Sequence, residues 1–185
     1  MILHKHNSNI IRFPVSEHKD FKNDFLREIE NSPGEKRVNG LGELISETDY
    51  QNCDDLSREY VKLFFDVFNP YIRKLIDTVN SNSLDVKHIW YQKYIKNDIH
   101  TWHVHADCMF AGVYFLDMPN SKSKTELYDI YNKKIIDYQA KEGDLIIFPS
   151  FIPHRSNYTP SRKTVISFNI NYDTVNLERI KTWNF

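Results

Sequence analysis

The sequence predicts a mainly β fold of the α+β class, in which N-terminal helices pack outside a jelly-roll (double-stranded β-helix) core. Two patterns favour this fold. Apolar side chains recur at helical spacing before residue 80, and short strand-like segments separated by turns follow residue 86. A chain of 185 residues also suits a single domain. We therefore expect one domain over residues 1–185, with helical support over about 16–80 and the jelly roll over about 86–172.

The first half is expected to be helical after a short strand over residues 9–15. Residues 16–31 carry apolar side chains at helical spacing and predict a first helix, and residues 31–42 predict a polar loop. A second helix should begin near Asp54, because aspartate caps helix starts well, and should run to about residue 80. Pro70 should interrupt or kink this helix because proline lacks a backbone N–H.

The second half concentrates β-branched and aromatic side chains in short segments, with turn residues between them. Two of these segments are separated by Tyr-Asn-Lys and predict a hairpin. The predicted strands cover residues 86–95, 102–116, 125–130, 134–139, 144–149 and 164–172.

Composition limits the classes of partner. With 24 basic and 25 acidic residues the formal net charge is -1, so there is no electrostatic reason to expect nucleic acid or an anionic membrane as a partner. The N-terminus lacks the features of a signal peptide, and no apolar run is long enough to cross a membrane. With only two cysteines as well, we expect a cytoplasmic protein. The aromatic tail with Trp183 and Phe185 is compatible with a homodimer.

Candidate metal ligands gather in the segment His103-Val-His105-Ala-Asp107, and His154 follows a later strand. Alternate side chains of a strand share one face, so two of these residues together with His154 can hold one divalent metal. His105, Asp107 and His154 would form the two-histidine, one-carboxylate site that non-heme Fe(II) oxygenases use. The alternative set, with His103 in place of Asp107, is all-nitrogen and also suits zinc or copper. We expect the first set, because a carboxylate is present at the right spacing.

Several motifs in the same part of the chain match a known family in order and spacing. They are Trp90-Tyr-Gln92, His103-Val-His105-Ala-Asp107, Ala111-Gly-Val-Tyr-Phe-Leu116, Gly143-Asp-Leu-Ile-Ile-Phe-Pro-Ser-Phe-Ile-Pro-His154 and Ser167-Phe-Asn169. Through them, residues 86–172 resemble the Fe(II)- and 2-oxoglutarate-dependent dioxygenases, and within these a group of small oxygenases common in phage and marine bacteria. The chain departs from that group at Gln92, Ala111 and Phe151, where the group usually has Asn, Ser and Trp.

The resemblance implies that 2-oxoglutarate is the cosubstrate and that a basic residue binds its far carboxylate. Strand alternation puts Lys163 on the same face as Ser167 and Asn169, whereas Arg162 would make the better bidentate partner for a carboxylate. Both candidates stay open on the sequence alone. Further candidates are Tyr94, Tyr114 and Asn169 for the cosubstrate, and His103 and Gln92 for the substrate.

The activity that the resemblance implies is hydroxylation of an unidentified small-molecule or peptide substrate, with release of succinate and CO2. Two other classes compete with it. A cupin-like enzyme with a three-histidine metal site would need no 2-oxoglutarate, and a non-catalytic jelly-roll module would bind a sugar or a protein. We expect no nucleic-acid partner, because the sequence has no basic patch interleaved with aromatic residues.

Overall fold

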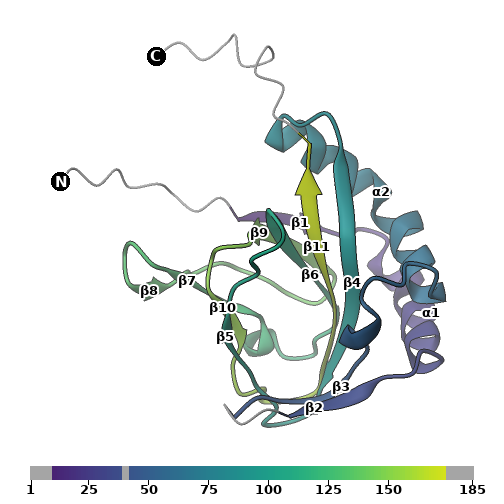
Figure 1. Ribbon diagram of the computed structural model, residues 1–185. Helices are drawn as coiled ribbons and strands as arrows, with labels where there is room; N and C mark the ends of the chain where they lie inside the picture. Colours follow the sequence, from purple (N-terminus) through teal and green to yellow (C-terminus); the bar gives the residue numbers. More distant parts are fainter. Residues whose placement is uncertain (1–9, 39–41, 174–185) are drawn as a thin grey trace.

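The computed structural model describes residues 10–38 and 42–173, which form two antiparallel sheets with two helices on one side (Figure 1). In order across the larger sheet, the strands are β1 (Ile11–Pro14), β9 (Asp144–Pro149), β6 (Phe110–Asp117), β11 (Lys163–Tyr172), β4 (Leu84–Tyr94), β3 (Leu44–Thr48) and β2 (Glu35–Val38). In the smaller sheet they are β5 (His100–His103), β10 (His154–Ser156), β7 (Glu126–Asp129) and β8 (Lys134–Ile135). The predicted mainly β, jelly-roll class is confirmed.

The helices α1 (His18–Glu30) and α2 (Glu59–Val79) cover the outer face of the larger sheet (Figure 1). Their apolar sides form one core with β4, β6, β9 and β11. In this core Phe64 stacks on Phe68 with ring centroids 4.5 Å apart, and Phe168 of β11 lies 5.0 Å from Phe64. α2 runs through Pro70 without ending, so the predicted interruption is not observed.

The observed elements differ from the predicted ones in several places. β10 was not predicted, and β8 keeps only the start of the strand predicted over residues 134–139. β2 lies within the segment predicted as a polar loop, and β3 lies in the following residues, for which no element was predicted. A short edge strand such as Glu-Lys-Arg-Val needs no apolar pattern. The predicted strand over residues 102–116 is divided into β5 and β6, with a loop between them. α2 begins at Glu59 rather than near Asp54, because the short 3-10 helix η1 (Tyr50–Asn52) and a turn come first.

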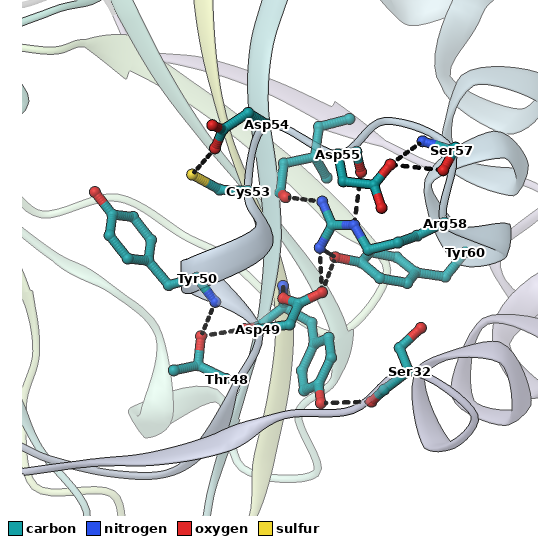
Figure 2. Close-up of polar contacts among 12 residues, drawn as sticks. Ser32, Thr48, Asp49, Tyr50, Cys53, Asp54, Asp55, Ser57, Arg58 and Tyr60 are labelled. Atoms are coloured by element: carbon teal, nitrogen blue, oxygen red, sulfur yellow. Dashed lines mark hydrogen bonds and ion pairs between the residues drawn. The ribbon is translucent and has the colours of Figure 1, made fainter.

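A buried ion pair fixes the start of α2 against β4 (Figure 2). Asp49 accepts hydrogen bonds from the guanidinium of Arg58 and from the hydroxyl of Tyr60, the latter at 2.7 Å. The other carboxylate oxygen accepts from the backbone N–H of Tyr91 at 2.8 Å, and Arg58 donates to the carbonyl of Ile89 at 2.6 Å. The pair therefore joins the helical layer to the middle of β4, whose other face lines the space between the sheets.

A second apolar cluster, including Phe115, Phe148 and Val165, fills part of the space between the sheets. The larger sheet also depends on a close approach at Gly112 in β6, where an added Cβ would lie 2.1 Å from the ring of Phe168. A side chain at this position would displace a ring that is almost fully buried.

In the described part of the chain, no helix is both long and apolar enough to cross a membrane. Trp183 and Phe185, which made a homodimer an expectation, lie outside the described residues, as does the start of the strand predicted from residue 9.

Candidate metal centre and cosubstrate pocket

Three histidines converge at the end of the smaller sheet. His103, the last residue of β5, pairs directly with His154, the first residue of β10. His105 lies in the loop after β5, where its backbone N–H donates to the carbonyl of Ser150 at 3.1 Å. One ring nitrogen from each of the three histidines lies within 4.8 Å of the other two. The Nε2 atoms of His105 and His154 are 3.2 Å apart, which is close to the spacing of two nitrogens that share one metal at about 2.1 Å.

The ring tautomers suit metal binding. Nδ1 of His103 lies 2.7 Å from the carbonyl oxygen of Thr101, and Nδ1 of His154 lies 3.0 Å from that of Ile152. A carbonyl only accepts, so each Nδ1 carries the proton and each Nε2 keeps a free lone pair. Local backbone carbonyls therefore orient both rings with Nε2 available as a ligand.

The three imidazoles are held in the uncharged form. Burial lowers the pKa of His103 to about 2 and that of His154 to about 3, and neighbouring imidazoles act in the same direction. Burial also lowers the pKa of His105, against the opposing effect of Asp107. Since a metal binds only the deprotonated ring nitrogen, no proton competes with it near neutral pH.

Asp107, the carboxylate in the first of the two predicted ligand sets, does not join this group among the described residues. Its side chain is 67% exposed, and its Oδ2 lies 4.0 Å from Nδ1 of His88. β5 ends at His103, so the alternation of side chains that would bring Asp107 to the same face does not continue along the loop. The geometry favours the alternative set, in which His103 joins His105 and His154.

A pocket between the sheets extends from the three histidines to Lys163, the first residue of β11. The Lys163 side chain is fully buried, and its Nζ donates to the carbonyl of Ser123 at 2.9 Å and to Oγ of Ser156 at 2.7 Å. Nζ also lies 4.4 Å from the centroid of the Tyr94 ring. Burial lowers the pKa of Lys163 to about 7. Within residues 10–38 and 42–173, no carboxylate is paired with this amine.

Arg162, the other candidate for the cosubstrate carboxylate, lies outside the pocket. Its side chain is 73% exposed and its Nε donates to Asp117 at 2.8 Å. Lys163, Val165 and Ser167 all line the pocket, as the predicted alternation of β11 requires.

The remaining predicted site residues fall into two groups. Tyr94 and Gln92 line the pocket, and Oε1 of Gln92 accepts from the Ser167 hydroxyl at 3.3 Å. Tyr114 lies on the opposite face of β6, in the core under the helices, with its hydroxyl 2.6 Å from Nδ1 of His18. Asn169 is buried near His88, with its Nδ2 3.4 Å from Nδ1 of that ring.

A second hollow adjoins the pocket and shares His100, His103 and His105 with it. It is lined by His100, His103, His105, Arg37, Glu43, Tyr50, Trp90 and Trp102. At its edge Nε2 of His100 lies 2.7 Å from Glu43, which Arg37 contacts at 3.2 Å. Arg37 and Glu43 were not predicted as site residues, because they lie in or next to a segment predicted to be a polar loop, and the pairing of β3 with β4 has no signal in the sequence.

Neither a family model nor a curated protein matches the chain, but solved structures resemble its fold. An oxidoreductase of the 2OG-Fe(II) oxygenase family from Burkholderia pseudomallei has a TM-score of 0.71 at 11% identity, over 88% of this chain and 85% of that one. HygX from Streptomyces hygroscopicus, with nickel and 2-oxoglutarate bound, has a TM-score of 0.62 at 11% identity, over 89% and 83%. A Trichoplax adhaerens prolyl hydroxylase in complex with a hypoxia inducible factor peptide fragment has a TM-score of 0.60 at 13% identity, over 95% and 87%. The likeness establishes the fold.

Proposed function

We propose that this chain is an Fe(II)- and 2-oxoglutarate-dependent oxygenase that hydroxylates a small-molecule or peptide substrate. The observation that carries the proposal is the pair of features at the two ends of one pocket. Three uncharged histidines lie at one end, and the buried amine of Lys163, for which no carboxylate partner is found in the described part of the chain, lies at the other. Such a pocket suits a ligand that chelates a metal at one end and carries a negative charge at the other.

In the proposed site, Nε2 of His103, His105 and His154 hold the iron. An all-nitrogen ligand set also suits zinc and copper, so these residues alone do not select the chemistry. Iron with 2-oxoglutarate, when bound, would let O2 oxidise the substrate and the cosubstrate together, so that one oxygen atom enters the product and the other enters succinate, with loss of CO2. The structures that resemble this fold include one with iron bound and one with nickel and 2-oxoglutarate bound, which supports the choice.

Lys163 binds the far carboxylate in this proposal. The amine would keep its two hydrogen bonds to Ser123 and Ser156 and donate its third N–H to the cosubstrate. Tyr94 fixes the amine from one side through its ring, and Phe148 excludes water from the wall of the pocket. A charge-assisted hydrogen bond in such a dry site is stronger than a neutral one.

The substrate would approach through the outer hollow, between Tyr50 and Trp102. The Trichoplax prolyl hydroxylase shows that this fold can bind a peptide. Both a peptide and a small molecule are therefore proposed as substrate classes for this chain. His103 is assigned to the metal in this proposal, so of the two predicted substrate residues only Gln92 remains, which lines both hollows.

An anaerobic titration of the metal-free protein with Fe(II), followed by 2-oxoglutarate, tests this function. We expect the visible charge-transfer band of an iron-bound keto acid. Lys163→Ala should weaken 2-oxoglutarate binding strongly, and the matched control Arg162→Ala should leave it unchanged, because Arg162 points to solvent. Tight iron binding without a band would instead support the three-histidine enzyme that needs no 2-oxoglutarate, and absence of metal binding would support the binding module.

The same titration decides between the two ligand sets. His103→Ala should abolish tight iron binding, whereas Asp107→Ala should keep both iron and the band. The opposite result would assign the metal to His105, Asp107 and His154.

A further inference from the structure

A second group of metal-binding side chains lies outside the three histidines. The thiol of Cys53, the carboxylate of Asp54 and one ring nitrogen of His88 all lie within 4.8 Å of one another. Cys53 and Asp54 follow η1, and the thiol points at Asp54 (Figure 2). His88 belongs to β4, and the backbone N–H of Ile89 donates to the carbonyl of Cys53 at 2.9 Å. The backbone therefore holds the two segments together whether or not a cation is bound.

We propose that Cys53, Asp54 and His88 bind a divalent cation of the zinc class beside β4. Sulfur, imidazole nitrogen and carboxylate oxygen are the three ligand types that zinc takes in proteins, with a water as the fourth ligand. At the usual metal–ligand distances, ligand atoms in a tetrahedral site lie about 3.3–3.8 Å from one another. The candidate ligand atoms of Cys53, Asp54 and His88 lie within 4.8 Å of one another, so they need to move only slightly closer together to reach this spacing. Sγ of Cys53 is already 3.1 Å from Oδ1 of Asp54.

The thiol is protonated without a cation. Burial, and then the neighbouring Asp54, raise the pKa of Cys53 to about 12, and the thiol donates its hydrogen bond to that carboxylate. Binding of the cation would release the thiol proton to solvent and place the thiolate and the carboxylate on the same positive charge. The hydrogen bond between Cys53 and Asp54 thus holds two ligands next to each other before the cation arrives.

Asn169, whose side chain also interacts with His105, provides a further observation at the His88 ring. This side chain is 3% exposed, and its Oδ1 is buried without a hydrogen-bond partner. Its amide contacts Nδ1 of His88 with Nδ2 at 3.4 Å, so exchanging the amide oxygen and nitrogen would aim the unpartnered oxygen at the ring. A histidine that binds a metal through Nε2 carries a proton on Nδ1 and donates it to such an acceptor. Oδ2 of Asp107, 4.0 Å from the same Nδ1, supports the same ring orientation.

The proposed cation would tie the loop after β5 to β4. Asp107 sits in that loop two residues after His105, and Trp90, two residues after His88 in β4, stacks on the His105 ring with 5.8 Å between centroids. A cation on His88 would hold the ring against Asp107 and so restrict the segment that carries His105. This site is therefore a structural support beside the metal centre and contains none of the three histidines.

Cobalt(II) titration of the metal-free protein, without 2-oxoglutarate, tests the proposal by absorption spectroscopy. A thiolate bound to cobalt gives a near-ultraviolet charge-transfer band that a site made only of histidines cannot give. The chain has two cysteines, so Cys108→Ser is a matched control for Cys53→Ser. We expect the band in the wild type, in Cys108→Ser and in His154→Ala, and its loss in Cys53→Ser.

A second variant guards against a folding defect in Cys53→Ser. His88→Gln keeps the thiol and should weaken the cobalt affinity of this site by at least about tenfold, with an unchanged far-ultraviolet circular dichroism spectrum. No thiolate band in the wild type, or a band that survives Cys53→Ser, would overturn the proposal. Neither result bears on iron or 2-oxoglutarate at the three histidines, because the readout requires a sulfur ligand.

Discussion

The affinity for 2-oxoglutarate should fall as the pH rises through 7, because its proposed partner is a lysine with a lowered pKa. Lys163 is buried and its pKa is about 7. The far carboxylate of the cosubstrate binds the ammonium form, so at alkaline pH each binding event must also take up a proton. Among the histidines of the proposed metal site, His103 and His154 do not contribute to this dependence, since burial keeps their pKa values at about 2 and 3, and burial also lowers the pKa of His105.

The expected magnitude follows from the fraction of protein in the competent form. With a pKa of about 7, about nine tenths of the lysine is protonated at pH 6 and about one tenth at pH 8. Apparent affinity scales with that fraction, so the dissociation constant of 2-oxoglutarate should rise at least about tenfold over this interval, which is about 1.4 kcal/mol. Bound iron would lower the pKa of Lys163 further and make the rise steeper.

The assay is the anaerobic charge-transfer titration of the iron-loaded protein at several pH values. Pyruvate is the control ligand, because it chelates through the same keto acid but lacks the far carboxylate. Its dissociation constant should show no step near pH 7. Lys163→Arg is the control variant, since an arginine stays charged throughout and should give a flat profile for 2-oxoglutarate.

The reasoning is refuted if 2-oxoglutarate and pyruvate weaken in parallel, because the dependence would then arise at the metal. It is also refuted if the Lys163→Arg protein binds 2-oxoglutarate and retains the full slope.

Three further outcomes concern stability and are measured by urea denaturation. Lys163→Met should stabilise the cosubstrate-free protein at pH 7 by about 1–3 kcal/mol while removing 2-oxoglutarate binding. Because the pKa of Lys163 is lowered from 10.5 to about 7 by folding, the wild type should gain stability as the pH rises from 7 towards 10.5. The variant should lack that gain. Arg58→Met leaves Asp49 buried without its cation and should cost about 3–5 kcal/mol. Gly112→Ala should cost about 1–3 kcal/mol, since the new methyl group overlaps the Phe168 ring, and an unchanged midpoint would contradict the close approach.

The fold was predictable where the apolar pattern was strong. The buried runs that became β9 and β11, and the amphipathic helix α2, were found near their true positions because one repeating pattern specified each. β2 and β3 were missed because neither short segment shows a regular apolar pattern. They are strands because β3 pairs with β4 and β2 pairs with β3, rather than through local preference.

The site was predictable at the level of its histidines and not at the level of its ligand set. The pattern His103-Val-His105-Ala-Asp107 is compatible with a continuous strand. In the structure the partner strand β10 begins at His154, opposite His103, so strand pairing ends there and the chain leaves the sheet before Asp107. The choice between Lys163 and Arg162 was likewise left open, because alternation favoured one and carboxylate chemistry the other. Burial separates them: Lys163 is 1% exposed and Arg162 is at the surface. The narrower relationship to small phage and marine oxygenases stays a prediction.

The position of Asp107 and the burial of Lys163 have a common electrostatic consequence. Three neutral imidazoles bring no negative charge to the pocket, so a divalent metal and the Lys163 ammonium together would leave it strongly positive. In a low-dielectric cavity that excess opposes the charged form of the lysine and favours a doubly negative ligand. A carboxylate in the metal set would cancel part of it and weaken the need for such a ligand. The exposed position of Asp107 is therefore consistent with a site in which the cosubstrate, rather than the protein, supplies the negative charge.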